Sequence, residues 1–255
     1  MHPAAIEFAG VRKHFGTAEI LRGVDLSIHQ GEFVGLAGVN GAGKTTLIKC
    51  LLDFCGIDSG RISLFGRSHL EPMSRSAIAF LPERFLPPYY LSGDDFLRHA
   101  ARLYQHPHDP IRVAKMLDTL SLDEEALKRT VRSYSKGMTQ KLGLAAIFLA
   151  ERRLYILDEP MSGLDPQARA GVMRLLSNVR REGRAVFLTS HALPDIEAAC
   201  DRVVVLHRGV PYFAGSPRQL CQDYGEVPIE QAFLRCIETP PNGRAEQQTV
   251  ASDRR

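Results

Sequence analysis

Apolar residues occur in this chain as short runs, and longer stretches with helical spacing separate the runs. The runs predict strands over 6–11, 24–28, 33–37, 61–66, 76–81, 154–158, 185–188 and 202–206. Within 24–28 apolar and polar residues alternate, as they do in a half-exposed antiparallel strand. The runs that begin at 154 and 185 are continuously apolar, which is typical of central parallel strands buried on both faces.

Apolar residues three or four positions apart predict helices between the runs. The first covers 45–54, and we expect Gly56 to stop it. Ser92 and Asp109-Pro110 carry start signals for two more helices, and Ser135 for a fourth that runs to Leu149. The expected buried faces of the helices after Ser92 and Asp109 are Phe96, Leu97, Ala100 and Leu103 in one and Ile111, Ala114, Leu117 and Leu120 in the other. A further helix is predicted over 167–182 and short helical pieces over 216–237.

These patterns predict an α/β fold with a mainly parallel sheet, an antiparallel N-terminal β-subdomain and an inserted helical subdomain. The expected division is a core with β-subdomain over about 1–84 and 150–215, a helical subdomain over about 85–149 and a helical extension over about 216–238. Residues 239–255 have Val250 as their one large apolar residue, and we expect a disordered tail there.

Composition narrows the class of protein. With 255 residues, 44% hydrophobic and 24% charged, the chain resembles an ordinary soluble globular protein. A formal net charge of +3 is too weak a bias to indicate nucleic-acid binding. The N-terminus has no signal pattern, and the longest apolar run, 142–150, is far short of the roughly 20 residues that span a bilayer. Five scattered cysteines without a C-x-x-C pair favour idle thiols in a reducing cytosol.

The stretch from Gly38 to Thr46 carries the most specific chemistry. It fits G-x-x-x-x-G-K-[ST] between a predicted strand and a predicted helix, which is the context that a phosphate-binding loop requires. Glycines let successive N–H groups turn toward phosphate oxygens, and the helix start adds its positive dipole end. Lys44 is expected to reach the β- and γ-phosphates and the Thr45 hydroxyl to hold Mg²⁺. The expected nucleotide-binding residues are Gly38, Asn40, Gly41, Ala42, Gly43, Lys44, Thr45 and Thr46.

Acidic residues follow two predicted strands. Asp158 and Glu159 end the run at 154–158, and the carboxyl ends of parallel strands are where ligands gather in open α/β sheets. We expect Asp158 to bind Mg²⁺ and Glu159 to orient or deprotonate the attacking water. Glu83 lies just beyond another strand. The residues alone leave two interpretations open for each of two further positions. His191 either reaches the ligand or is an ordinary surface or core residue, and Phe15 either stacks on adenine or is an ordinary core residue.

The chain resembles the nucleotide-binding subunit of an ATP-binding cassette (ABC) transporter over about residues 4–236. The resemblance rests on the phosphate loop, on Tyr155 to Glu159, on a D-loop that contains Asp165, and on His191 as the family's switch histidine. It implies a P-loop NTPase with a RecA-like core, one ABC ATPase domain over 1–236, and ATP and Mg²⁺ as cofactors. It implies catalytic roles for Lys44, Glu159 and His191, and it places Phe15 at the family's adenine-stacking position.

Two stretches depart from the family pattern. At 134–138 Ser135 and Gly137 match the signature loop, whereas Tyr134, Lys136 and Met138 differ. The resemblance implies that Ser135, Lys136 and Gly137 meet the γ-phosphate bound to a second copy, with Lys136 equally interpretable as a solvated lysine. Glu83 replaces the usual glutamine and retains the ability to coordinate Mg²⁺. Three stretches are similar to those of bacterial ABC-2-type exporters, whose ATPase and membrane domains are separate polypeptides. They are Leu81-Pro82-Glu83, residues 134–138, and Ser190-His191 leading to Cys200-Asp201-Arg202.

The resemblance implies two partners: a separate transmembrane permease and a second copy of the chain, with two ATP molecules between the copies. No nucleic acid is expected, and the implied location is cytoplasmic, on the inner face of the cell membrane through the permease. The implied function is an ATPase that drives an exporter. The alternatives are an ABC ATPase that acts on ribosomes or DNA, and a nucleotide-gated scaffold with little turnover. The transported substrate does not follow from the sequence.

Overall fold

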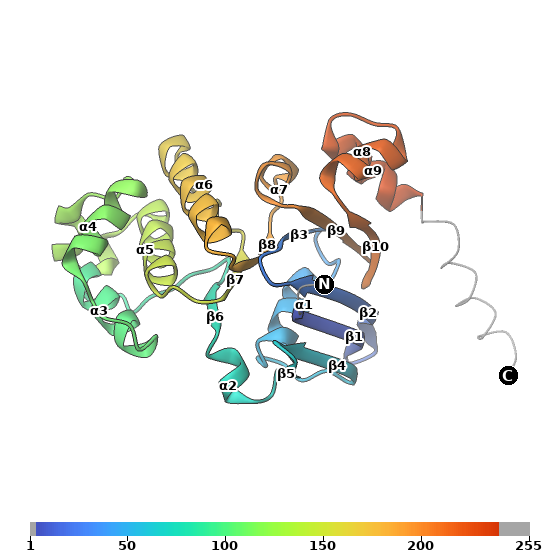
Figure 1. Cartoon of the computed structure of the whole chain (residues 1–255), viewed down its shortest axis with the longest axis horizontal. Helices are drawn as coiled ribbons and strands as arrows, with labels where there is room; N and C mark the ends of the chain where they lie inside the picture. Colours follow the sequence, from blue (N-terminus) through green and yellow to red (C-terminus); the bar gives the residue numbers. More distant parts are fainter. Residues whose placement is uncertain (1–3, 240–255) are drawn as a thin grey trace, which may run out of the picture.

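The structure, a computed structural model, describes residues 4–239. Its centre is a six-stranded sheet in the order β10-β9-β3-β8-β7-β6 (Figure 1). The strands are β3 (Phe33–Ala37), β6 (Ile78–Leu81), β7 (Leu154–Asp158), β8 (Ala185–Thr189), β9 (Arg202–His207) and β10 (Val210–Gly215). All neighbours pair in parallel except β9 and β10. The carboxyl ends of β3, β6, β7 and β8 therefore lie at one edge, as the sequence predicts.

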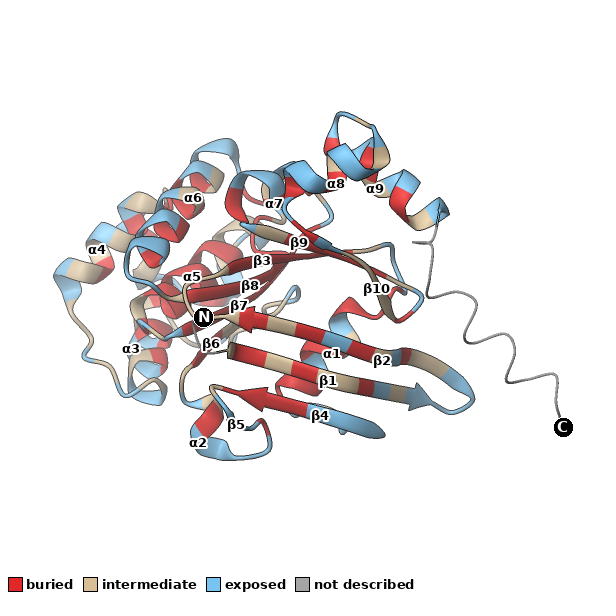
Figure 2. Ribbon diagram, turned by 45° about the vertical axis from the view of Figure 1, so that its right-hand side comes forward, coloured by how far each residue is buried: buried red, intermediate tan, exposed pale blue. Residues whose placement is uncertain are grey.

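Alternate residues of the central strands enter two separate apolar cores. Tyr155 and Leu157 face one core together with residues of the helices, whereas Leu154 and Ile156 face the other together with residues of the antiparallel sheet. The helices on the first side are α5 (Lys136–Leu149), α6 (Pro166–Arg181), α7 (Leu193–Ala199) and α9 (Ile229–Glu238). Burial on both faces explains why β7 and β8 are apolar up to their last residues, Asp158 and Thr189 (Figure 2).

A second sheet, in the order β2-β1-β4-β5, covers the other side of the central sheet together with α1 (Lys44–Leu51). Its strands are β1 (Ala4–Phe15), β2 (Ala18–His29), β4 (Ser59–Leu64) and β5 (Arg67–Ser68), all antiparallel. The half-exposed antiparallel strand predicted from the alternation over 24–28 is confirmed, because Val24, Leu26 and Ile28 are buried while Asp25 is exposed. Phe15 is the last residue of β1, at the turn into β2.

The helical block between β6 and β7 consists of α3 (Gly93–Leu103), α4 (Pro110–Thr119), two short 3₁₀ helices (Glu124–Lys128 and Val131–Ser133) and α5. Each predicted cap is present: the side chains of Ser92, Asp109 and Ser135 accept hydrogen bonds from backbone N–H groups of the first turn that follows. The buried residues of this block form one continuous apolar core with one face of the central sheet.

Two expected buried faces of this block were partly wrong. Leu103 is 71% exposed and Ile111 is 81% exposed. In α4 the buried stripe is Val113, Leu117 and Leu120. Steps of three residues fall about 60° short of a full helical turn each time, so a series of such steps that starts at Ile111 drifts to the opposite side of the helix. In α3 the periodicity is right, but burial ends one turn before Leu103.

Helix α1 ends three residues before its predicted end at Phe54. Asp53 takes a left-handed conformation with φ 62°, and the N–H of Phe54 closes the turn onto the carbonyl of Lys49. The chain therefore leaves the helix before Gly56. Strand β5, helix α2 (Pro72–Arg75), helix α7 and strand β10 were not predicted. The helical pieces over 216–237 are α8 (Pro217–Tyr224) and α9, and the expected tail lies outside the described residues from 240 onward.

Close packing between α6 and the end of α4 generates a prediction for stability. A Cβ atom added at Gly171 would lie 2.0 Å from the carbonyl oxygen of Thr119. We expect Gly171→Ala to lower the free energy of unfolding by about 1–3 kcal/mol, because backbone has to shift to relieve the overlap. Chemical denaturation measures the effect, with Ser177→Ala on the exposed side of α6 as the control. Unchanged stability of Gly171→Ala would contradict the close approach.

Candidate nucleotide-binding site

The phosphate loop connects β3 to α1 and is shaped by three glycines. Gly41 and Gly43 have φ values of 79° and 107°, which residues with a Cβ atom rarely adopt. At Gly38 a Cβ atom would lie 2.5 Å from the carbonyl oxygen of Leu206 in β9. The glycines of the motif are thus required both by the turn of the loop and by its close contact with the sheet.

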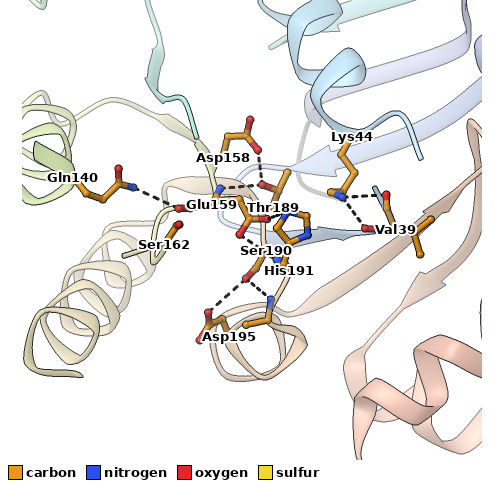
Figure 3. Close-up of polar contacts among 12 residues, drawn as sticks. Val39, Lys44, Gln140, Asp158, Glu159, Ser162, Thr189, Ser190, His191 and Asp195 are labelled. Atoms are coloured by element: carbon orange, nitrogen blue, oxygen red, sulfur yellow. Dashed lines mark hydrogen bonds and ion pairs between the residues drawn. The ribbon is translucent and has the colours of Figure 1, made fainter. Parts of the chain in front are cut away.

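Lys44, the first residue of α1, is 8% exposed and extends back into this loop. Its ammonium donates hydrogen bonds to the carbonyl oxygen of Gly38 at 2.6 Å and to that of Val39 at 3.4 Å (Figure 3). Burial lowers the pKa of Lys44, and the negative charges of Glu159, Asp158 and Glu83 oppose this effect. The Lys44 ammonium is therefore poorly solvated, and an anionic ligand in the loop would stabilise its charge.

Asp158 and Glu159 lie at the carboxyl end of β7 and are 6% and 8% exposed. Burial raises the pKa of both side chains, and in Asp158 the charge of Glu83 adds to the effect. The hydroxyl of Thr189, at the end of β8, donates to Asp158 Oδ1 at 2.6 Å and accepts from the N–H of Glu159 at 3.0 Å. Thr189 therefore fixes the two acidic residues relative to each other.

His191 lies directly against Glu159. Its backbone N–H donates to Glu159 Oε2 at 3.1 Å, and its Nε2 lies 3.5 Å from Oε1 (Figure 3). Glu159 adopts a left-handed backbone conformation with φ 51°, which is uncommon for residues other than glycine. Such a strained conformation persists only where surrounding contacts hold it, and it turns the carboxylate toward His191.

These groups surround one open cavity of ≈ 390 Å³. Its lining joins the phosphate loop to Glu83, Asp158, Glu159 and His191, and Phe15 and Ile20 complete it. The ring of Phe15 is 52% exposed, as a stacking surface requires, with Lys13 Nζ 5.2 Å from the ring centre. The structure thus brings together residues from the ends of β1, β3, β6, β7 and β8 that the sequence placed at the site separately.

The signature residues lie in a different place. Ser135 caps α5, and neither it nor Lys136, Gly137 or Asp165 lines the cavity. Lys136 Nζ instead lies 3.4 Å from the hydroxyl of Ser162, in the loop after β7. Within one copy of the chain, these residues are therefore separate from the phosphate loop.

Two residues with roles at the site were missed in the sequence. Thr189 and Gln140 are both buried, and both hydrogen-bond to the backbone of Glu159. A threonine that ends an apolar strand immediately before Ser190 and His191 was a usable signal. No pattern marked Gln140, because its partners are backbone carbonyl groups far away in the sequence.

The donor set fits a magnesium ion that also has phosphate ligands. Among residues 4–239 no group of three or more His, Cys, Asp or Glu side chains is arranged to hold a metal ion by itself. Mg²⁺ in nucleotide sites needs only one or two protein ligands beside phosphate oxygens and water. The Thr45 hydroxyl and the Asp158 carboxylate line the same cavity and supply this number, with the Glu83 carboxylate as a further candidate.

Comparison with known sequences decides the family. The sequence model of the family described as ABC transporter matches residues 21–162, which include the phosphate loop, Asp158 and Glu159. The chain belongs to the ABC transporter family. The family prediction made from the motifs is thereby confirmed.

Curated relatives of this chain are described as ATP-binding proteins. An uncharacterized ABC transporter ATP-binding protein of Synechocystis sp. is 36% identical over 201 residues, which are 78% of this chain and 57% of that protein. The bacitracin transport ATP-binding protein of Enterococcus faecalis is 36% identical over 80% of this chain and 67% of its own length. The Nod factor export ATP-binding protein I of Rhizobium sp. is 32% identical over 91% and 78%. The aligned part of the chain thus spans about six tenths of the length of the Synechocystis relative.

Solved structures share the fold. An ATP-binding subunit of an ABC transporter has a TM-score of 0.83 at 28% identity, covering 91% of this chain and 99% of that one. A bacterial Atm1-family ABC exporter with ATP bound has a TM-score of 0.79 at 19% identity, covering 92% of this chain and 42% of that one. The predicted fold class is confirmed. No helix within residues 4–239 has the length and apolar character needed to cross a membrane.

The buried carboxylates generate a prediction of pH dependence. Because the pKa of Glu159 is raised in the folded chain, folding favours its protonated form, and stability is lost as the pH rises from the unfolded pKa through the folded pKa. We therefore expect Glu159→Gln to raise the melting temperature of the nucleotide-free protein at pH 8. This gain should shrink as the pH is lowered toward 4.5, the ordinary pKa of a glutamate side chain. The exposed Glu71→Gln is the control; a gain that grows on acidification would contradict the assignment.

Proposed function

We propose that this chain is an ATP-binding and ATP-hydrolysing subunit that powers an ABC-type membrane exporter. The observation that carries the proposal is the shared cavity, in which Lys44 and Thr45 of the phosphate loop face Asp158, Glu159 and His191. Relatives described as acting in Nod factor export, bacitracin transport and linearmycin resistance support the exporter role.

The loop amides and Lys44 bind and neutralise the β- and γ-phosphates, so that Lys44 exchanges its loop carbonyl partners for phosphate oxygens. Thr45 and Asp158 would hold Mg²⁺, which would neutralise phosphate charge, and Glu83, which lines the same cavity, is a further candidate ligand. Phe15 stacks on the adenine. Glu159 orients and deprotonates the attacking water, for which a raised carboxyl pKa is suitable because it makes the carboxylate a stronger base. His191, held against Glu159, contacts the γ-phosphate.

The assembly that we propose contains two copies of the chain and a separate transmembrane permease. Ser135, Lys136 and Gly137 of one copy meet the γ-phosphate bound to the other, and Asp165 belongs to the loop that crosses between the copies. The Ser135-capped helix start is an anion site by its dipole and free N–H groups. Loss of the γ-phosphate removes contacts that only the closed pair makes, so hydrolysis reopens it.

The proposed location of the chain is the cytoplasmic face of the cell membrane. The proposed ATPase domain comprises residues 1–236.

Substitution of Glu159 tests the proposal directly. We expect Glu159→Gln to lower kcat for MgATP hydrolysis about 100-fold or more, because the base is lost while the shape of the side chain is kept. This variant should still bind ATP and accumulate as an ATP-dependent dimer in size-exclusion chromatography, whereas Lys44→Ala should bind ATP poorly. Steady-state phosphate release gives the rate, with Glu71→Gln as the control. A parental rate in Glu159→Gln would refute the assigned mechanism.

Phe15→Ala tests the position of the base. Stacking of an aromatic ring on a base contributes about 1–3 kcal/mol, so we expect Kd for ATP to rise about 10-fold, with kcat at saturating ATP little changed. Titration with a fluorescent ATP analogue measures the affinity. Phe54→Ala removes an exposed ring that does not line the cavity and should leave Kd unchanged. Equal affinities for Phe15→Ala and the parent would place the adenine elsewhere.

A further inference from the structure

The amino-terminal turns of α5 contact the loop that follows β7, residues 159–165, at several points. This loop begins with Glu159 and ends with Asp165, which caps α6 by accepting from the N–H of Ala168 at 2.8 Å. The function proposed above uses the two ends of this loop and the Ser135 end of α5. It assigns nothing to Gln140 and Lys141, whose side chains also join the helix to the loop.

Gln140 makes the innermost of these contacts. Its side chain is 5% exposed, and its Nε2 donates to the carbonyl oxygens of Pro160 at 3.1 Å and Glu159 at 3.4 Å (Figure 3). On the opposite side, the N–H of Glu159 donates to Thr189 in β8. The backbone of Glu159 is therefore held from α5 and from β8 at the residue whose φ of 51° needs such support.

Lys141 holds the far end of the same loop. Its Nζ donates to Asp165 Oδ2 at 2.6 Å and to the carbonyl oxygen of Ser121 at 2.9 Å, and its side chain is 10% exposed. Hydrogen bonding from Lys141 is the main cause that lowers the pKa of Asp165. An ion pair with one partner this well buried depends on good geometry. Without the Lys141 ammonium, Asp165 would keep only its hydrogen bond from the N–H of Ala168 at the start of α6.

The backbone of α5 approaches the loop closely as well. A Cβ atom added at Gly137 would lie 2.9 Å from the carbonyl oxygen of Gly163, so only a glycine fits there without a shift. Lys136 lies along Gly163 and reaches the hydroxyl of Ser162. The start of α5 and the 159–165 loop thus form one packed unit, fastened at Gln140, at Lys141 and at the glycine contact.

We propose that Gln140 and Lys141 are positioning residues that fix the Glu159 carboxylate relative to the Ser135 end of α5. The inference rests on the proposed function, because it concerns the placement of the group that activates water. A displacement of α5 is transmitted through Gln140 to the backbone of Glu159, and through Lys141 to Asp165. When the Ser135 end of α5 in one copy binds the nucleotide of the second copy, this contact therefore affects the position of the Glu159 carboxylate in the first copy.

Kinetics of Gln140→Leu and Lys141→Met test this proposal. Both substitutions keep most of the side-chain volume and remove the donors. We expect kcat for ATP to fall about 10-fold in each, with KM within about 2-fold of the parent, because a misplaced general base affects chemistry and not binding. Lys141→Arg restores the charge next to Asp165 and should recover most of kcat. Gln222→Leu in α8 and Lys115→Met in α4, both at exposed positions, are the matched controls.

A double-mutant cycle separates positioning from a purely structural role. If Gln140 acts through Glu159, adding Gln140→Leu to Glu159→Gln should cause no further loss in the residual single-turnover rate, whereas independent effects would multiply. A lowered melting temperature with kcat unchanged, or a full additional loss in the double variant, overturns the inference. Should Gln140→Leu fail to fold, Gln140→Asn, which is one methylene too short to reach both carbonyls, replaces it with the same expected loss of kcat.

The outcome for Glu159→Gln alone distinguishes this inference from the proposed function. A parental rate in Glu159→Gln refutes the mechanism assigned to Glu159 in the proposed function. A strongly reduced kcat in Glu159→Gln together with a parental kcat in both Gln140→Leu and Lys141→Met refutes the positioning role only. A strongly reduced kcat in Glu159→Gln, a reduced kcat in the two variants and a non-additive cycle support both.

Discussion

The site depends on the burial of two neighbouring carboxylates at the end of one strand. Asp158 and Glu159 are almost fully removed from water, and this burial raises the pKa of both. Such an arrangement is unfavourable unless hydrogen bonds and opposite charges compensate it. Thr189, the backbone N–H of His191 and the ammonium of Lys44 supply the compensation. Thr189 ends the neighbouring strand β8, His191 follows it, and Lys44 begins α1 after the loop that leaves β3. The parallel sheet is what makes these ends meet.

This arrangement leaves a site that is electrostatically incomplete without a ligand. Lys44 is partly desolvated and bonded to carbonyl oxygens of its own loop, which carry no full charge. Glu159 Oε1 is buried and makes no hydrogen bond, and His191 Nε2 lies 3.5 Å from it. The phosphates of a bound nucleotide would supply an anion for the lysine, and the proposed Mg²⁺ would supply a cation for the carboxylates. The same features that lower the stability of the nucleotide-free chain therefore favour nucleotide binding.

The contacts between α5 and the 159–165 loop give the helical block a direct mechanical connection to this site. The apolar core of the block is continuous with one face of the central sheet, so the block is not a loosely attached insertion. Polar contacts at the border, from Gln140 to carbonyl groups and from Lys141 to Asp165, are directional, in contrast to the apolar packing around them. Directional contacts fix the placement of the 159–165 loop more narrowly than burial alone does.

The sequence by itself determined the phosphate loop, the strand that ends in Asp158 and Glu159, the helix caps at Ser92, Asp109 and Ser135, and the family. These features are local: spacing and turn chemistry act within a few residues, so a linear pattern records them. Tertiary structure decided which apolar residues are buried, as Leu103 and Ile111 show, and it ended α1 at Leu51. It also decided the roles of Thr189 and Gln140. Their partners are backbone groups of Glu159 and Pro160 and the carboxylate of Asp158, which sheet pairing and helix packing bring near, and no spacing along the chain encodes such contacts.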